Sequence, residues 1–328
     1  MVRAVAIAIA LALFAWTLRD VDASALGALL VSVGPLGALA LVPQLSGSVL
    51  HAGAWRQLLA GLGHKKPLLP LTSISLSADA ARMAAPAGPA VAESIAAFEL
   101  RRRLRVPWSP TLTSLAAKKA WVFCSNAAAI ALLLMVGQHE LGRLAAFVPR
   151  GAFLPHLALA ASVALAVLGS TSLGLLSSPR VALGVKRVMT RLPSRGIQAW
   201  IRRHLDRPAA GATAALPWSR HGAACAYLLG QWATDILETW LMLHLLGARA
   251  SLPAAMMIEL GTSLVRSAAF VVPGGLGFQD ASYAGMISSL GVTGNSEIGA
   301  AFVLMKRAKE LIFTSIGLAL LAVSRRPR

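Results

Sequence analysis

The stretch VVPGGLGFQD, residues 271–280, interrupts a segment of the chain that is otherwise apolar. Pro273 has no amide hydrogen to donate, so a helix that enters this stretch is broken there. Three glycines follow the proline: Gly274, Gly275 and Gly277. They suit either a tight turn between two short helices or a close approach of the backbone to a ligand. Asp280 adds a carboxylate just beyond the break.

The composition around this break is that of an integral membrane protein. Of the 328 residues, 56% are hydrophobic and only 13% are charged, and the mean hydropathy is +0.67. A net charge of +18 suits nucleic acid in a soluble protein, but such proteins lack several apolar stretches of about 20 residues. We therefore expect no nucleic-acid partner. Cys124 and Cys225 lie in apolar segments without metal-ligand spacing, so neither a metal site nor a disulfide framework is expected. No cofactor is expected either.

We expect an all-α fold that forms one membrane domain over residues 1–328. Six segments are predicted to span the membrane: 2–18, 26–50, 111–136, 153–176, 219–246 and 297–323. The first also fits a signal peptide, with VDA at 21–23 as its cleavage site.

Two further apolar stretches, 71–100 and 255–290, are interrupted by PAGP and PGGLG. Each piece reaches only about 21–26 Å, which is short of the roughly 30 Å hydrocarbon core. Each stretch is therefore predicted to form a re-entrant helical hairpin. Its irregular backbone must be buried in protein or face water.

The distribution of basic residues supports this topology. If both hairpins return to their own side, one face receives the N-terminus, loops 51–70, 101–110 and 177–218, and the C-terminus. These segments hold nineteen Lys and Arg, whereas the opposite loops hold four. The positive-inside rule then predicts that both termini are cytoplasmic. Within the basic loop 177–218, residues 179–208 fit either an amphipathic helix on anionic lipid or a plain retention signal.

The broken turn has a counterpart in the first half of the chain. RMAAPAGPAVAES carries Arg82, Pro86 and, seven residues beyond the proline, Glu93. RSAAFVVPGGLGFQDAS repeats this order with Arg266, Pro273 and Asp280.

A basic pair follows each acid at nearly equal spacing: Lys118 and Lys119 in the first half, Lys306 and Arg307 in the second. We therefore predict an internal repeat with copies at about 71–136 and 255–323. Three predicted crossings separate the copies, so the second copy is inverted, as in many transporters.

Eight of the thirteen acids lie in the apolar segments. A charge at the centre of a membrane helix costs about 2.5–3.5 kcal/mol, so these groups are expected to pair or to line a wet cavity. For Glu99, Asp79 and Lys118, snorkelling to the headgroups is an equal alternative. Lys306 and Glu310, four residues apart, fit an intrahelical pair equally well.

For Arg82, Glu93, Arg266 and Asp280 we favour a central cavity, with Glu93 and Asp280 facing each other across it. Half-helix N-termini and the basic residues then suit an anionic or polar lipid headgroup. The predicted binding residues are Arg82, Pro86, Gly88, Glu93, Lys119, Asp235, Glu238, Arg266, Pro273, Gly274, Gly275, Gly277, Gln279, Asp280, Lys306, Arg307 and Glu310.

The second broken segment and the helix predicted after it, residues 266–313, resemble the C-terminal signature of the flippase-like family typified by the transmembrane region of lysylphosphatidylglycerol synthase. The RSAAF before the turn is most similar to the hopanoid-biosynthesis-associated branch. PAGPAVAES is similar to the family's Pro-Gly-Gly-Glu element, with Pro89 in place of a small residue. The resemblance covers roughly 70–323 and implies a bacterial inner-membrane protein that moves or handles lipids between leaflets.

We therefore expect a lipid translocator without catalytic residues. The alternatives are a scaffold that has lipid-synthesis enzymes as its partners and a lipid-modifying enzyme. Against the enzyme, the chain has no Ser-His-Asp constellation, HExxH motif or P-loop. Without an ATP-binding motif, active transport requires an ion gradient, with Glu93, Asp280 and Asp235 as candidate proton carriers.

Overall fold

The computed structural model describes Ala12 and residues 21–85, 88–147, 151–177, 217–268, 272–293 and 295–324. Every regular element within these ranges is a helix, which confirms the all-α prediction. Three described segments are long and apolar enough to cross a membrane: Ala23–Gly61, Trp108–Val136 and Gly151–Leu176. The predicted helix 2–18, apart from Ala12, and most of the basic loop 177–218 lie outside the described residues.

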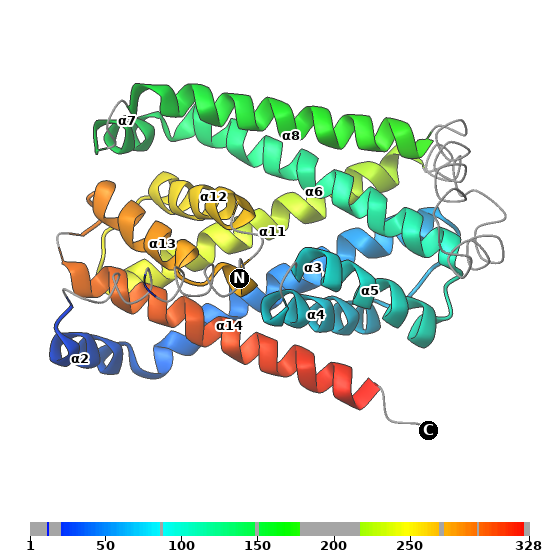
Figure 1. Ribbon diagram of the computed structural model, residues 1–328, viewed down its shortest axis with the longest axis horizontal. Coiled ribbons are helices and arrows are strands. Elements are labelled where there is room, and N and C mark those ends of the chain that lie inside the picture. Colours follow the sequence, from blue (N-terminus) through cyan, green and yellow to red (C-terminus); the bar gives the residue numbers. More distant parts are fainter. Residues whose placement is uncertain are drawn as a thin grey trace.

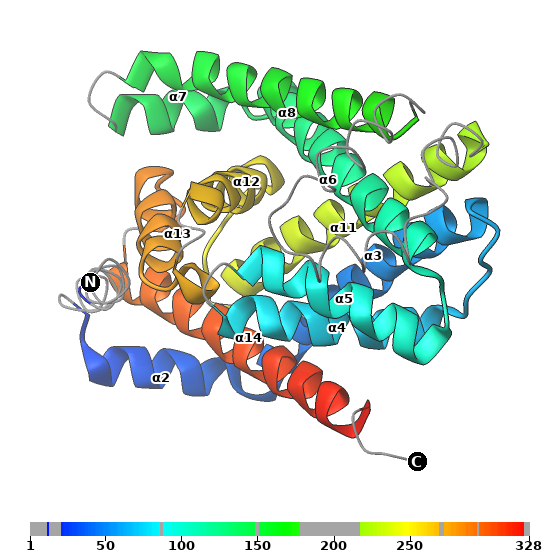
Figure 2. The ribbon, with the colours of Figure 1, turned by 45° about the vertical axis from the view of Figure 1, so that its right-hand side comes forward.

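Four long helices run along the length of the molecule (Figure 1). They are α6 (Trp108–Val136), α8 (Leu154–Ser177), α11 (Trp218–Leu245) and α14 (Ser296–Ser324). Their limits agree with the predicted spans to within three residues. Pro107 and Pro217 fix the starts of α6 and α11, because a proline does not need the amide hydrogen that a first turn leaves unbonded. Figure 2 shows α8 packed along α6.

The predicted helix 26–50 is wrong in its continuity and its end. The chain forms α2 (Ala23–Val33), a 3-10 segment η1 (Gly34–Ala40) and α3 (Leu41–Gly61). Gly34 adopts φ +50° at the break, and the proline that follows lacks an amide hydrogen. Helix α3 continues to Gly61 because residues beyond 50, Trp55 among them, are fully buried.

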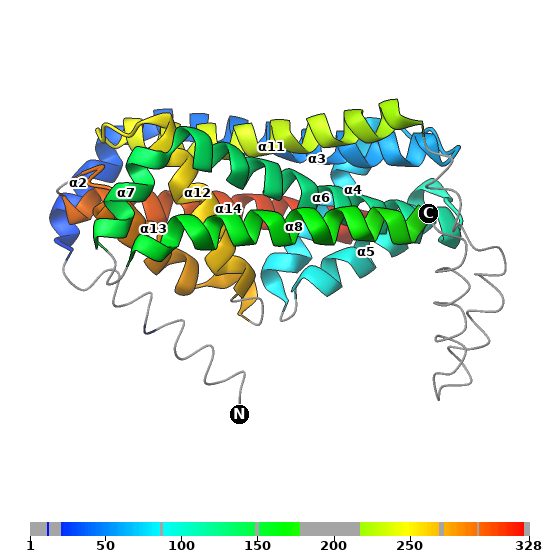
Figure 3. The ribbon, with the colours of Figure 1, turned by 90° about the horizontal axis from the view of Figure 1, so that it is seen from above.

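Each interrupted stretch folds into two helices that pack together. The first hairpin is α4 (Leu68–Ala84) with α5 (Gly88–Leu104), and the second is α12 (Leu252–Ala268) with α13 (Phe278–Ser289). A 3-10 turn, η3 (Pro273–Gly275), forms the tip of the second hairpin and packs on α4. In Figures 1 and 3 the hairpins enter from opposite ends of the long helices, and their tips lie near the middle.

The described loops lie at the two ends of the bundle. One end of the bundle (Figure 1) carries residues 62–67 and 105–107, the C-terminal ends of α8 and α14, and the start of α11. The opposite end carries the 246–251 and 290–295 connections and a further helix, α7 (Gln138–Phe147), followed by η2 (Gly151–Phe153). Helix α7 was not predicted from the sequence.

Glycines allow the hairpins and long helices to approach closely. A Cβ at Gly317 of α14 would lie 2.6 Å from the Ala80 Cβ of α4, and one at Gly53 of α3 would lie 2.8 Å from the Tyr227 ring of α11. Both distances are shorter than any normal contact. The first hairpin is therefore held directly against α14, beside the charged residues of that helix.

Candidate functional site

A cavity of about 480 Å³ lies in the middle of the bundle, where the hairpin tips meet. Helices α3, α4, α5, α6, α11, α12, α13 and α14 and the turn η3 all contribute to its lining. The contact between the tips is close, since a Cβ at Gly274 would lie 3.1 Å from the Met83 methyl of α4.

Most of the predicted site residues line this cavity. They are Arg82, Gly88, Glu93, Lys119, Asp235, Glu238, Arg266, Gly274, Gly275, Gln279, Lys306 and Glu310. The described lining does not include Gly277, Asp280 or Arg307. Pro86 and the side chain of Pro273 lie outside the described part of the chain. The two halves of the chain therefore meet at one cavity, as the paired motifs predicted.

Asp280 does not face Glu93 across the cavity, contrary to the prediction. One carboxylate oxygen accepts from the backbone N–H of Gly277 at 2.8 Å, and the other accepts from Nε of Arg307 at 2.7 Å. The physical reason is its place in the first turn of α13, where an acid caps the unbonded amides of the helix. Asp280 therefore fixes the hairpin tip to α14.

Arg307 completes this attachment of the second tip. Its guanidinium also donates to the carbonyl of Gly274 at 3.3 Å and to Glu310 at 2.6 Å. Gly274 and Gly275 adopt φ +61° and +62°, a conformation that side chains disfavour. These two glycines are thus needed for the turn, and both also line the cavity.

A buried cluster of two acids and two lysines forms the wall contributed by α11, α12 and α14. Glu238 accepts from Lys306 at 2.8 Å and from Lys309 at 2.6 Å. Lys306 also donates to Glu259 at 3.1 Å. Of the two alternatives for Lys306, the intrahelical pair with Glu310 is not formed, because Lys306 points to α11 and α12.

Hydroxyl groups complete the shell around Glu259. Thr239 donates to it at 2.6 Å, and the Tyr283 hydroxyl lies 3.2 Å from it. The Lys306 ammonium also lies 5.4 Å from the centre of the Tyr283 ring, within the range of a cation–π contact. This wall is neutral as a whole, although Oε2 of Glu238 is buried without a hydrogen-bond partner among the described residues.

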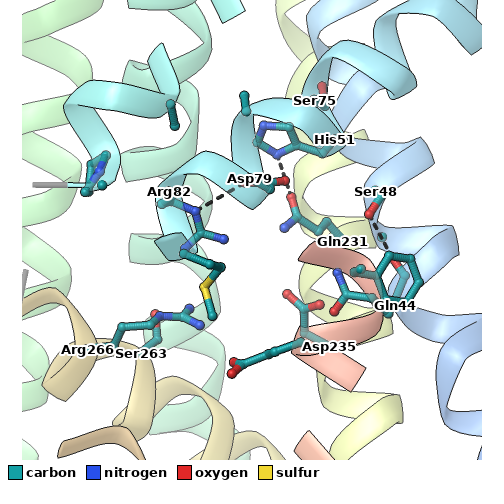
Figure 4. Close-up of a pocket in the computed structure, with 18 of the residues that line it drawn as sticks. Gln44, Ser48, His51, Ser75, Asp79, Arg82, Gln231, Asp235, Ser263 and Arg266 are labelled. Atoms are coloured by element: carbon teal, nitrogen blue, oxygen red, sulfur yellow. Dashed lines mark hydrogen bonds and ion pairs between the residues drawn. The ribbon is translucent and has the colours of Figure 1, made fainter. Parts of the chain in front are cut away.

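The remaining walls carry polar groups that are less completely paired. Figure 4 shows the guanidinium groups of Arg82 and Arg266 on one side of the cavity, with Gln231 and Asp235 across from them. Arg82 contacts Asp79 at 3.2 Å, whereas Arg266 forms no ion pair with any residue that the structure describes. Oε2 of Glu93 is likewise buried without a hydrogen-bond partner among the described residues.

Asp79, Lys118 and Glu99, for which snorkelling to the headgroups was an equal alternative, have different surroundings. Asp79 and Lys118 line the cavity, and the Lys118 ammonium lies 4.6 Å from the centre of the buried Trp55 ring. Glu99 is buried near the end of α5, where it pairs with Arg102 at 2.9 Å and accepts from Ser324 at 3.1 Å. Lys118 therefore does not snorkel, and Glu99 joins α5 to α14 outside the cavity.

Sequence reasoning missed several polar residues of the lining, among them Gln44, Ser48, His51, Gln231, Glu259 and Lys309. His51 and Gln231 join α3 to α11 through a contact of 2.9 Å. The spacing of some of these residues in the sequence could have predicted them. Gln44, Ser48 and His51 recur at the helical spacing of one face, and Gln231, Asp235 and Glu238 repeat that spacing on α11.

An apolar helical bundle with two broken hairpins around a charged cavity defines a polytopic membrane protein with an internal polar site. The chain belongs to the family described as the lysylphosphatidylglycerol synthase TM region, whose family model matches residues 3–317. A comparison with curated proteins gives no match.

Proposed function

We propose that the protein moves lipids between leaflets by binding a polar or phosphate headgroup in the central cavity. The observation that carries this proposal is the cavity itself, which both hairpin tips line with charged groups inside an apolar bundle. A headgroup within it would be shielded from hydrocarbon, while the acyl chains remain in lipid. The membrane family and the apolar helices agree with this role.

The cavity has groups suited to a phosphate. Arg266 has no ion-pair partner among the described residues, and Arg82 lies on the same side of the cavity (Figure 4). The N-terminus of α5 begins at Gly88, which also lines the cavity. Helix N-termini and guanidinium groups both bind phosphate oxygens.

The proposed topology has two re-entrant hairpins in an inverted repeat. Its support is the entry of the hairpins from opposite ends and the shared order of a long helix, a hairpin and a long helix in each half. Because the described loops that carry Lys65, Lys66 and Arg105 lie at one end, we assign that end and, by the predicted topology, both termini to the cytoplasm of a bacterium, with the bundle in its inner membrane.

We propose a carrier rather than an enzyme. Neither an ATP-binding motif nor a catalytic constellation occurs in the sequence, so a gradient would drive any active transport. Glu93 and Asp235 are the proposed proton carriers, since both carboxylate oxygens of Asp280 are already engaged. The RSAAF segment before the turn favours a hopanoid-related role, either in transport or as a scaffold beside lipid-synthesis enzymes.

Reconstitution in liposomes with a leaflet-reporting fluorescent phosphatidylglycerol tests the proposal. We expect Arg266→Gln and Glu93→Gln each to slow exchange between leaflets by about tenfold or more, because a charged hydrogen bond contributes about 1.5–3 kcal/mol. Arg249→Gln is the matched control, since Arg249 is exposed in the 246–251 connection. Size-exclusion profiles verify folding.

Exchange by the wild type no faster than in empty liposomes would refute the carrier. Formation of a modified lipid without exchange would indicate the enzyme instead. Neither activity, together with co-purification of lipid-synthesis enzymes, would indicate the scaffold.

A further inference from the structure

A second, apolar hollow of about 480 Å³ lies between α5 and α6. Helix α5 contributes Glu93, Ser94, Ala97 and Phe98, and α6 contributes Trp108, Leu112, Leu115, Ala116 and Lys119. These positions follow the helical repeat, so each set forms a stripe along one face. We call this hollow the α5–α6 groove.

Aromatic side chains close one end of the α5–α6 groove. Phe98 and Trp108 pack edge to face with their ring centres 5.3 Å apart. The Arg101 guanidinium lies 5.1 Å from the centre of the Trp108 ring. Phe98 is 61% exposed, as an apolar side chain at a lipid-facing surface can be. A tryptophan with a basic neighbour is typical of headgroup depth in a membrane protein.

The other end of the groove is charged and adjoins the central cavity. Glu93 and Lys119 line both spaces. Lys119 lies eleven residues after Trp108, about 16 Å deeper along α6 at 1.5 Å per residue. It is exposed and forms no ion pair with a described residue. A lysine near the middle of a membrane helix is costly unless a partner or water meets it.

We propose that the α5–α6 groove is the lateral entrance for lipid, holding one acyl chain of a phospholipid while its phosphate contacts Lys119. This proposal rests on the proposed transport function and specifies how the substrate reaches that site. The apolar lining matches an acyl chain, and the unpaired ammonium matches a phosphate. Because Glu93 and Lys119 border both spaces, a headgroup held at Lys119 already lies beside the central cavity.

The position beside the cavity favours a lipid over a partner protein helix as the occupant. A protein helix seated in the groove would bury Lys119 at this depth and would need a carboxylate placed against it. A phospholipid carries its phosphate and its acyl chain in one molecule, so it satisfies both ends of the groove.

Photocrosslinking tests the entrance independently of transport. The full-length protein is reconstituted in vesicles of phosphatidylethanolamine and phosphatidylglycerol, with a phosphatidylglycerol probe that carries a diazirine midway along one acyl chain. Adducts are mapped by mass spectrometry. In the wild type we expect them on the groove faces of α5 and α6, near Phe98 and Leu112.

Two variants and a matched control decide the result. Ala116→Trp fills the groove and should abolish these adducts. Lys119→Gln should lower them by about fivefold, the equivalent of about 1 kcal/mol for one basic residue near lipid headgroups. Ala128→Trp makes the same change at an exposed position of α6 outside the groove, and it should leave them unchanged.

Adducts spread evenly along α6 and insensitive to Ala116→Trp would overturn the entrance, even if leaflet exchange occurs. Groove adducts that Lys119→Gln leaves unchanged would also overturn it, because the groove would then bind chains without contacting the headgroup. Groove adducts sensitive to both variants, in a protein that exchanges no lipid, would support the lipid site and refute the transport function.

Discussion

Replacing Glu238 by Gln removes one negative charge from a buried cluster that is neutral as a whole. Glu238 and Glu259 balance Lys306 and Lys309, and the Glu238 carboxylate accepts from both lysines. After the substitution Lys306 still pairs with Glu259. Lys309 keeps no ion-pair partner among the described residues, so it becomes an uncompensated buried charge.

The expected cost is large because the site is nearly inaccessible. Glu238 is 1% exposed and Lys306 is 4% exposed. Removing one partner of a buried ion pair costs about 3–5 kcal/mol. At about 2 °C per kcal/mol, the thermal midpoint should fall by roughly 6–10 °C. We expect this shift in purified protein in detergent, followed by tryptophan fluorescence during heating.

A second substitution separates charge imbalance from lost packing. Glu238→Gln combined with Lys309→Met leaves only the Lys306–Glu259 pair and should recover most of the lost stability. Asp79→Asn is the control for an acid-to-amide change. The side chains of Asp79 and Arg82 are 49% and 37% exposed. Loss of their ion pair should therefore change the free energy of unfolding by less than about 1 kcal/mol.

A thermal midpoint for Glu238→Gln within a degree or two of the wild type would refute the assignment of this cluster as a closely paired structural wall. Equal and additive losses from Glu238→Gln and Lys309→Met would refute the pairing between them, because residues that form one ion-pair network are not additive.

Three further substitutions test the hairpin tips and the helix contacts. Gly275→Ala, at φ +62°, should lower stability by about 1–2 kcal/mol in thermal unfolding, whereas Gly222→Ala, in open space on α11, should not; equal effects would contradict the turn. Gly317→Leu should prevent α14 from packing on α4 and abolish the monodisperse size-exclusion peak; a normal peak and midpoint would contradict this contact. Asp280→Asn should weaken the Arg307 attachment and lower the thermal midpoint, and loss of lipid exchange at an unchanged midpoint would instead place Asp280 in the binding site.

The long helices could be predicted from the sequence because their apolar lengths determine where they lie; prolines also precede α6 and α11. The break at Gly34 could have been found by the same logic, since Gly-Pro disfavours helix as PGG does. The end of α3 could not, because its polar residues beyond position 50 are typical of a loop. Only tertiary packing shows that Trp55 is buried, where its indole donates to Ser114 at 3.1 Å.

The sequence indicated which residues lie at the cavity better than it indicated which side chains pair with one another. The motif spacing predicted that Arg82, Glu93 and Arg266 share one cavity, and all three line it because the two hairpin tips meet there. Spacing carries no information on which way a side chain turns within its helix. Lys306 therefore pairs across to α11 rather than along α14, and Asp280 caps its own helix.

The matched positions of the predicted repeat differ in their contacts, and this difference is informative. Asp280 and Arg307 form an ion pair of 2.7 Å in the second half. Their counterparts Glu93 and Lys119 form none with each other or with any other described residue. Nearly equal spacing therefore gives a closed arrangement in one half and an open one in the other. The unpaired half is also the one that borders the α5–α6 groove, so charge left without a protein partner coincides with this apolar hollow. A ligand that supplied both charges would remove this asymmetry, which is the physical reason to seek the headgroup at Glu93 and Lys119 rather than at Asp280.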